Sequence, residues 1–184
     1  PISLYTYITL SKRYDKYYVI NYTKREHIKS PNNIKNDIAR ELIKYFDLPP
    51  VTISFNADIP TTGSGLASSS SYMVAAVAAA CKFKKLDWSQ AKICKIAHNL
   101  ELNFNPLTGY QDTYGCGLPS SKFMVFNGDV SVKSIDIPKT NIFLCNTNVN
   151  RSSTKILKTI DIDKSYPLLK LTDKVYENLN KDNS

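Results

Sequence analysis

The feature that most constrains the fold is a glycine- and serine-rich segment, residues 58–72, between a strand-like run and an alanine-rich helix. It reads D-I-P-T-T-G-S-G-L-A-S-S-S-S-Y. The preceding V-T-I-S-F alternates as a strand does, and Pro60 ends it. Gly63 and Gly65 permit positive φ angles and a close approach of the backbone to a ligand. A helix is predicted to begin near Ser68.

A strand, a glycine loop and a helix start together form an anion-binding arrangement. The first N–H groups of a helix have no intrahelical partner, and with the helix dipole they favour a phosphate. The alternative is a flexible turn followed by a serine-capped core helix. We predict that a nucleotide phosphate binds here, through Thr62, Gly63, Ser64, Gly65, Leu66, Ala67, Ser68 and Ser69.

Two other phosphate-binding motifs do not fit the segment. The chain has no G-x-x-x-x-G-K-[ST] sequence, so the lysine-bearing loop of P-loop NTPases is absent. G-S-G-L-A-S imitates a dinucleotide fingerprint, but A-D-I-P-T-T separates it from the strand. A Rossmann site is therefore disfavoured.

The rest of the chain predicts an α+β fold. Aromatic and β-branched runs at 4–10 and 16–22 have the pattern of two antiparallel strands joined by a tight connection. Apolar residues recur at helical spacing over 33–46, over 68–83, in a helix capped by Asp87 or Ser89, and from Leu168 to Leu179. Further strands are predicted at 51–55, at 122–126 and 130–137 around an Asn-Gly-Asp turn, and at 141–146.

The loop resembles the P-x-x-x-G-L-G-S-S-A phosphate motif of the GHMP small-molecule kinases. Ala67 replaces a glycine of that motif, Ser70 replaces an alanine, and one extra residue separates Pro60 from Gly65. Within the superfamily the chain is most similar to the D-glycero-D-manno-heptose 7-phosphate kinases, which carry a similar serine run and a Q-D-x-Y segment. Residues 109–115 here read G-Y-Q-D-T-Y-G, and the resemblance extends along almost the whole chain.

The resemblance implies which residues hold the metal ion and which residue acts on the acceptor hydroxyl. Phosphoryl transfer needs a phosphate cradle, a divalent ion and a carboxylate that orients or deprotonates the acceptor. Glu101 matches the glutamate that holds Mg²⁺ with a loop serine, here Ser69, and hard oxygen ligands suit that ion. Asp112 matches the catalytic aspartate. The alternatives are that Glu101 faces solvent at a helix end and that Asp112 caps the next helix.

Three further residues are candidate substrate contacts. Gln111 and Tyr114 lie within two residues of Asp112, and core packing is the alternative for Tyr114. Arg151, in N-T-N-V-N-R-S-S, matches the family's T-G-x-x-R-S-A segment and could bind an anionic substrate group through its guanidinium. An exposed arginine in a loop is the alternative for that position.

The resemblance also implies an incomplete enzyme. Complete members begin with a P-L-R-[IV]-S-F-x-G-G-G-T-D strand and end with a second glycine-rich segment, and neither occurs among these 184 residues. We therefore expect residues 1–160 to form the N-terminal, nucleotide-binding domain, with a ribosomal-protein-like core of βαβ units and antiparallel strands. Residues 161–184 would begin a C-terminal domain that is largely absent.

The charge distribution and the hydropathy of the chain argue against nucleic-acid and membrane partners. The net charge is +8, but the basic residues are dispersed without a run of five, which argues against a nucleic-acid module. The sequence contains no window of eighteen apolar residues, so no membrane-spanning helix is predicted. We expect a cytoplasmic enzyme that binds ATP, Mg²⁺ and a sugar or sugar phosphate, with a homodimer as the candidate assembly and with no nucleic-acid or membrane partner.

The sequence as a whole favours an ATP-dependent kinase that phosphorylates the anomeric hydroxyl of a sugar phosphate such as D-glycero-D-manno-heptose 7-phosphate. A galactose- or fucose-type kinase is an alternative. Such kinases share the same kind of phosphate loop, and a fold does not fix the substrate. A non-catalytic fragment that binds nucleotide or sugar phosphate is the other alternative.

Overall fold

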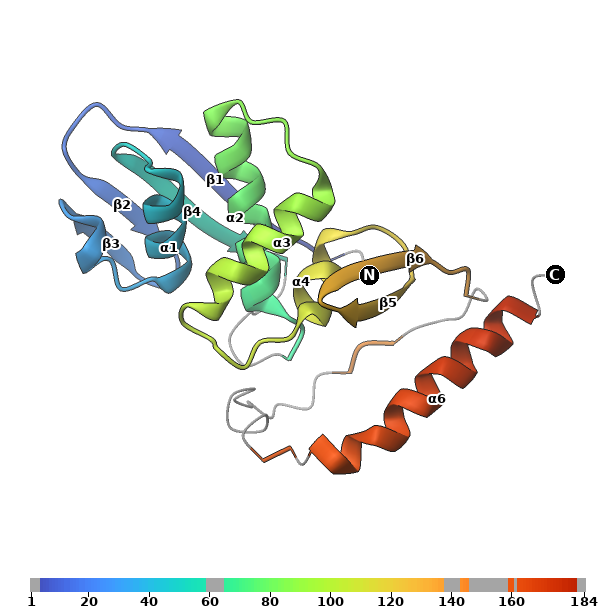
Figure 1. Cartoon of the computed structure of the whole chain (residues 1–184). Helices are drawn as coiled ribbons and strands as arrows, with labels where there is room; N and C mark the ends of the chain where they lie inside the picture. The colour runs from blue at the N-terminus through green and yellow to red at the C-terminus, as the bar shows by residue number, and fades with distance from the viewer. Residues whose placement is uncertain (1–3, 59–64, 138–142, 146–158, 161, 182–184) are drawn as a thin grey trace. The chain divides into compact units, whose positions relative to one another are not determined.

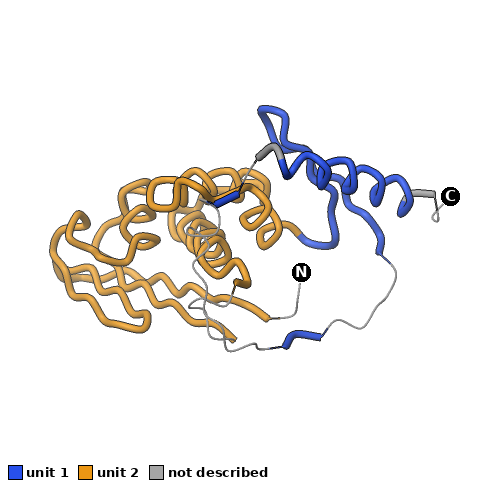
Figure 2. Tube along the Cα trace, turned by 90° about the horizontal axis from the view of Figure 1, so that it is seen from below, with its two compact units in different colours: residues 1, 119–184 blue, residues 2–118 orange. Residues whose placement is uncertain are grey.

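The computed structural model describes residues 4–58, 65–137, 143–145, 159–160 and 162–181 (Figure 1). The chain forms two compact units, residues 2–118 and residues 119–184, which Figure 2 colours separately. The first unit holds a four-stranded sheet and its helices, and the second holds a hairpin and a long helix.

The sheet of the first unit contains β1 (Thr6–Lys12), β2 (Tyr18–Asn21), β3 (Arg25–Ile28) and β4 (Val51–Ala57), in the order β1-β4-β2-β3. β4 pairs antiparallel with β1 and parallel with β2. The predicted hairpin between the first two strands is therefore wrong, because β4 lies between them. Val51 and Ile53 of β4 are fully buried, which suits a central strand, whereas β1 at the edge leaves Tyr7 exposed.

Strand β3 was not predicted, because R-E-H-I has no run of apolar or β-branched residues. The strand is held by its pairing with β2 and by the buried carboxylate of Glu26. That carboxylate accepts hydrogen bonds from the backbone N–H groups of Lys35, at 2.7 Å, and Asn36, at 3.0 Å. The side chain thereby fixes the chain just before the first long helix.

Three helices cover one face of this sheet (Figure 1). α1 (Asp37–Phe46) follows a short 3₁₀ turn, η1 (Pro31–Asn33), and begins later than predicted, where the Asn36 side chain caps the N–H of Ala39 at 2.9 Å. α2 (Ser68–Lys84) starts at the predicted residue. α3 (Gln90–Leu102) is capped by Ser89, one of the two predicted caps.

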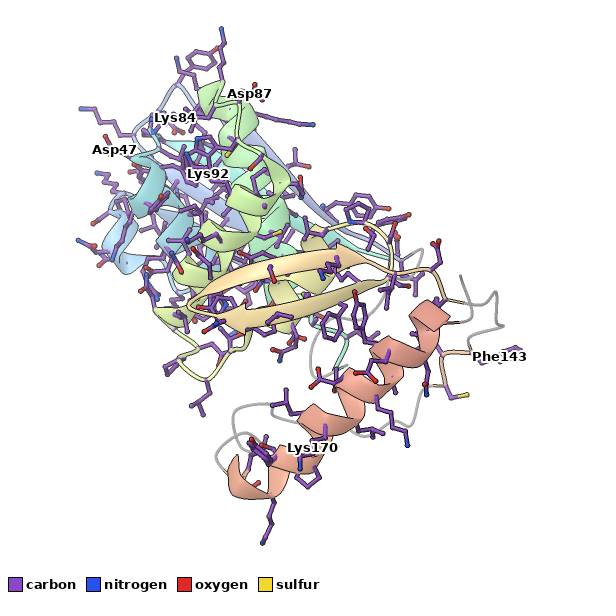
Figure 3. All side chains as sticks on the ribbon, turned by 45° about the vertical axis from the view of Figure 1, so that its right-hand side comes forward. Asp47, Lys84, Asp87, Lys92, Phe143 and Lys170 are labelled. Carbon is purple, nitrogen blue, oxygen red and sulfur yellow. The ribbon has the colours of Figure 1, made fainter. Side chains whose placement is uncertain are left out.

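The apolar sides of the three helices and the sheet share one core. Its fully buried members are contributed by the central strands and by all three helices, and the largest are Ile20, Ile34, Leu42, Ile43, Ile53, Met73 and Val77. At the far end of α2, the Lys84 ammonium donates to the Asp47 carbonyl at 3.0 Å and joins the ends of two helices (Figure 3). The core thus fixes α2 and α3 against the sheet.

A further helix, α4 (Tyr110–Gly117), packs on α2 and α3. It was not predicted, because Y-Q-D-T-Y-G-C-G is short and rich in glycine. Gly117 explains the close packing: a Cβ atom at that position would lie 2.3 Å from the Cys94 sulfur of α3 and 3.3 Å from a methyl group of Val74 on α2. Only glycine permits this approach without displacement of the neighbouring helices.

The second unit contains β5 (Lys122–Asn127) and β6 (Asp129–Ser134), which confirm the predicted hairpin, with Gly128 at φ 76° in the turn. The predicted strand at 141–146 is wrong for residues 143–145, which are irregular, and its other residues lie outside the described ones. α6 (Ile162–Lys181) confirms the C-terminal helix, and the ring of Tyr176 stacks on Phe123 at 4.0 Å. Among the described residues, no helix has both the length and the apolar character that a bilayer crossing requires.

Candidate functional site

The start of α2 adopts the backbone conformation that the loop motif requires. Gly65 has φ 71° and Ala67 has φ 55° and ψ 33°, so both are left-handed. For an alanine this conformation costs about 1–2 kcal/mol. Position 67, where the family motif has glycine, therefore keeps the glycine conformation in spite of the substitution.

The predicted phosphate cradle is described in part. Thr62, Gly63 and Ser64 lie outside the described residues, whereas residues 65–69 form the entrance to α2, with Ser68 half-buried and Ser69 exposed. Ala67 at the N-cap has no side-chain oxygen, and the first turn contains no acidic residue. The positive end of this seventeen-residue helix is thus suited to an anionic ligand.

A buried hydrogen bond links this helix start to α3. The Ser70 hydroxyl donates to Oε2 of Glu101 at 2.6 Å, and the two residues are 2% and 1% exposed. Glu101 is therefore not a solvent-facing helix residue. It occupies the last turn of α3, where its backbone carbonyl also accepts the N–H of Asn105 at 2.8 Å.

The serine that contacts Glu101 is Ser70, and no hydrogen bond joins the predicted Ser69 to this carboxylate within the described structure. Successive residues of an α-helix project about 100° apart. Ser70 shares its face with buried Met73 and Val77 and points into the protein, whereas Ser69 is exposed at the helix entrance.

The Glu101 carboxylate provides a test of whether Mg²⁺ fits. None of the ion pairs found among the described residues involves it, and a buried carboxylate is costly unless its charge is compensated. No cluster of three or more His, Cys, Asp and Glu among those residues could hold a metal. Mg²⁺ in nucleotide sites uses one or two carboxylates together with phosphate oxygens and water, so the single Glu101 carboxylate, joined to the start of α2 by Ser70, fits that ion.

Both flanks of the loop are tied to β1. On one side, Oδ2 of Asp58 accepts the backbone N–H of Tyr5 at 2.9 Å and the Tyr7 hydroxyl at 3.1 Å. On the other, the hydroxyls of Thr6 and Ser71 lie 2.7 Å apart. Desolvation and the hydrogen bond to Asp58 both raise the pKa of Tyr7 above its ordinary value, so its hydroxyl remains a donor at neutral pH.

The first turn of α4 carries the predicted catalytic aspartate. The N-cap of this helix is Gly109, so Asp112 is not the cap; it lies in the first turn and is half-buried. Gln111 beside it is exposed. Tyr114 is 4% exposed, which fits the core-packing interpretation better than a substrate contact.

A buried histidine positions this turn, and sequence reasoning gave it no role. The His98 ring stacks on Tyr110 at a centroid distance of 3.9 Å, which joins α3 to the first residue of α4. Burial lowers the pKa of His98. Its Nδ1 and the Thr113 hydroxyl are buried without a hydrogen-bond partner among the described residues. The signal available was spacing, because His98 precedes Glu101 by three residues and shares its helix face.

The structure thus packs α2, α3 and α4 together, with the start of α2 joined to the last turn of α3 and the first residue of α4 joined to α3. α4 packs on both other helices, and the bond from Ser70 to Glu101 and the stack of His98 on Tyr110 join them. Arg151 lies outside the described residues, so its predicted role remains a prediction.

Comparison with known proteins gives matches in one family. The sequence profile described as GHMP kinases N terminal domain matches residues 32–119. A mevalonate kinase of Saccharolobus solfataricus is 36% identical over 75 residues, which cover 40% of this chain and 24% of the relative. A D-glycero-alpha-D-manno-heptose 7-phosphate kinase of Campylobacter jejuni is 28% identical over 139 residues, which cover 68% of this chain and 41% of the relative.

Solved structures agree on the fold. The crystal structure of the Methanococcus jannaschii mevalonate kinase superposes with a TM-score of 0.64 at 15% identity, over 95% of this chain and 62% of that one. This chain therefore spans less than two thirds of the length of each of these three proteins. The matched region, residues 32–119, contains α1, β4, α2, α3 and α4. Residues 32–119 therefore match the N-terminal domain of the GHMP kinases, within a mixed α+β fold.

Proposed function

We propose that this chain belongs to an ATP-dependent sugar kinase that phosphorylates the anomeric hydroxyl of a sugar phosphate such as D-glycero-D-manno-heptose 7-phosphate. The observation that carries the proposal is the hydrogen bond between Ser70 and Glu101, at 2.6 Å. It joins a helix entrance suited to phosphate to a buried carboxylate suited to a divalent ion. The helix α4, which carries Asp112, packs against α2 and α3.

The residues divide the work of phosphoryl transfer. The amides and hydroxyls at the entrance of α2, from Gly65 to Ser69, would hold the phosphates of ATP. Glu101 and the Ser69 hydroxyl would hold Mg²⁺, which when bound neutralises the charge of the β- and γ-phosphate oxygens. The positive end of α2 adds to this field without a lysine.

Asp112 would orient the acceptor hydroxyl and take its proton. The hydroxyl oxygen forms a bond to the γ-phosphorus, the bond from that phosphorus to the β–γ bridging oxygen breaks, and ADP leaves with the bonding pair. Because transition states of this kind can be loose, correct placement of the hydroxyl supplies much of the benefit. Gln111 is exposed beside Asp112 and is the better placed of the two predicted α4 contacts.

Two observations favour a sugar phosphate as the acceptor. The relative matched over the longer stretch of this chain, 139 residues, is the heptose 7-phosphate kinase, and the Q-D-T-Y sequence around Asp112 agrees with that branch. Arg151 is the proposed partner of the substrate phosphate. A mevalonate kinase also matches, over 75 residues, so the acceptor must be tested directly.

The test uses the full 184-residue chain with ATP and Mg²⁺. D-glycero-D-manno-heptose 7-phosphate, galactose, fucose and mevalonate are offered separately, and ADP release and the phosphorylated product are measured. We expect turnover with the heptose phosphate above all others. Preference for mevalonate, or for an unphosphorylated sugar, would refute the acceptor proposed here.

Nucleotide binding is measured in parallel, because an inactive chain could still bind ATP. Binding of ATP without transfer to any acceptor would support the alternative, a non-catalytic fragment that binds nucleotide or sugar phosphate. A cytoplasmic location and a homodimer are proposals of the same standing, and the mass of the purified chain in solution tests the second.

A further inference from the structure

We propose that Ser70 is a positioning residue that holds the Glu101 carboxylate in place for a divalent cation, a role additional to that of Ser69. The proposal rests on the proposed function, because it concerns the cation that would accompany ATP. It assigns different tasks to two neighbouring serines at the entrance of α2.

The contact itself has the properties of an anchor. The Ser70 hydroxyl donates to Oε2 of Glu101 at 2.6 Å, within the range of hydroxyl donors to a charged carboxylate. Both side chains are almost completely buried, at 2% and 1% exposure. In such surroundings the bond is stronger than in water, and the loss of the donor would leave a buried acceptor unsatisfied.

The bond constrains Oε2 of the carboxylate, and Oε1 is the atom that would contact the cation. Groups that orient a metal-binding carboxylate from behind are a general feature of metal sites, and their removal costs roughly 10–100-fold in metal affinity or activity. Ser70 is placed for this task because the stripe it shares with Met73 and Val77 faces the interior. Ser69 is exposed and remains the serine that could reach the cation itself.

The loop motif supports a role beyond packing. Its G-L-G-S-S-A form has alanine at the position of Ser70, so a small apolar side chain is compatible with the helix there. A serine in this chain adds one buried hydroxyl, and that hydroxyl donates to Glu101.

The experiment measures ATP affinity of the full chain by calorimetry, once with excess Mg²⁺ and once with EDTA. The dissociation constant for ATP in EDTA divided by the dissociation constant in Mg²⁺ is the Mg²⁺ ratio. It reports how much the cation contributes to ATP binding. We expect Ser70→Ala to reduce this ratio by about 10-fold while the affinity for ATP in EDTA changes little. Glu101→Gln should reduce the ratio at least as far, and the double variant should lose no more than Glu101→Gln alone.

The matched control is Ser71→Ala. It removes a hydroxyl from the same turn of α2 and breaks the 2.7 Å contact to Thr6, but it does not touch Glu101. We expect it to leave the Mg²⁺ ratio unchanged. Thermal unfolding of each variant, monitored by circular dichroism, confirms that the chains compared are folded.

The outcomes separate this inference from the proposed function. If the unsubstituted chain shows Mg²⁺-dependent ATP binding and Ser70→Ala retains all of it, or if Ser71→Ala loses as much, the positioning role is wrong and the kinase proposal stands. If Ser70→Ala loses the Mg²⁺ effect but the unsubstituted chain transfers phosphate to no acceptor, the positioning role stands and the kinase proposal fails. ATP binding that is indifferent to Mg²⁺ in the unsubstituted chain overturns the inference.

Discussion

Ala67 occupies a backbone conformation that glycine adopts more easily, so Ala67→Gly should stabilise the fold. Its φ of 55° and ψ of 33° lie in the left-handed region, where an alanine Cβ costs about 1–2 kcal/mol. Glycine removes that strain but adds freedom to the unfolded chain, which costs about 0.4–1 kcal/mol. The difference leaves a net stabilisation between about 0 and 1.6 kcal/mol, with a midpoint of about 0.8 kcal/mol.

Thermal unfolding followed by circular dichroism measures this change. For a unit of this size, a stabilisation of about 1 kcal/mol raises the melting temperature by roughly 4 °C, so an increase of about 2–4 °C is expected. Urea unfolding should give a higher midpoint with an unchanged slope, because the surface exposed on unfolding is the same.

Two variants serve as matched controls on the same helix. Lys85 ends α2 at φ 56° and ψ 40°, so Lys85→Gly relieves similar strain far from the phosphate site. Ala79 lies inside α2, and Ala79→Gly should destabilise by about 1 kcal/mol. If Ala67→Gly destabilises as Ala79→Gly does, or if Lys85→Gly raises the melting temperature and Ala67→Gly does not, the strain assigned to position 67 is refuted.

Three further results are expected. Asp112→Asn should lower turnover by about 100-fold or more with an unchanged circular dichroism spectrum, and near-normal turnover would contradict the catalytic role. His98→Phe keeps the ring stacked on Tyr110 and removes the unpaired nitrogen. Since burial lowers the pKa of His98, protons bind preferentially to the unfolded chain, and the stability of the unsubstituted chain should fall as the pH drops below about 6.5. The phenylalanine variant should lack this part of the pH dependence in urea titrations, and an unaltered profile would contradict it. The hydrogen bond from Arg13 lowers the pKa of Asp15 to about 2, so its contribution to stability is present above about pH 4 and is lost as the pH falls toward the folded-state pKa. Carboxyl NMR should find that low midpoint, and Arg13→Ala should return it to the ordinary range.

Sequence patterns predicted the helices and strands that are determined by their own residues and not by distant contacts. The glycine–serine segment fixed the start of α2 because positive φ angles and a run of small polar residues mark a helix entrance. The Asn-Gly-Asp turn likewise predicted the hairpin of β5 and β6. These elements could be found without knowledge of the rest of the fold.

Other features depend on partners distant in the chain. β4 lies between β1 and β2, a pairing between distant segments that no single segment reveals. β3 is stabilised by pairing and by the Glu26 carboxylate, which binds amides about ten residues away. α4 is short, and its packing depends on Gly117 meeting α2 and α3. Tertiary contacts rather than propensity select these elements.

The serine that contacts Glu101 was not predicted, although the local sequence contained the signal for it. Motif matching aligned Ser69 with the metal-binding serine, whereas the hydrogen bond comes from Ser70. Helical spacing contained the necessary signal, because residues 70, 73 and 77 form one stripe and the last two are apolar. A polar residue on that stripe must find a buried partner, and the buried carboxylate of Glu101 provides it.

The hydroxyls of Ser69, Ser70 and Ser71 point in different directions because they follow one another along a helix. Successive helix residues project about 100° apart, and accordingly Ser69 is exposed at the phosphate entrance, Ser70 binds Glu101, and Ser71 contacts Thr6 of β1. Each hydroxyl therefore connects the helix start to a different surrounding: the ligand side, α3 and the sheet. Because these surroundings differ, loss of each hydroxyl should alter a different measurement. Removal at position 69 should affect the nucleotide complex directly, at position 70 its dependence on Mg²⁺, and at position 71 only stability.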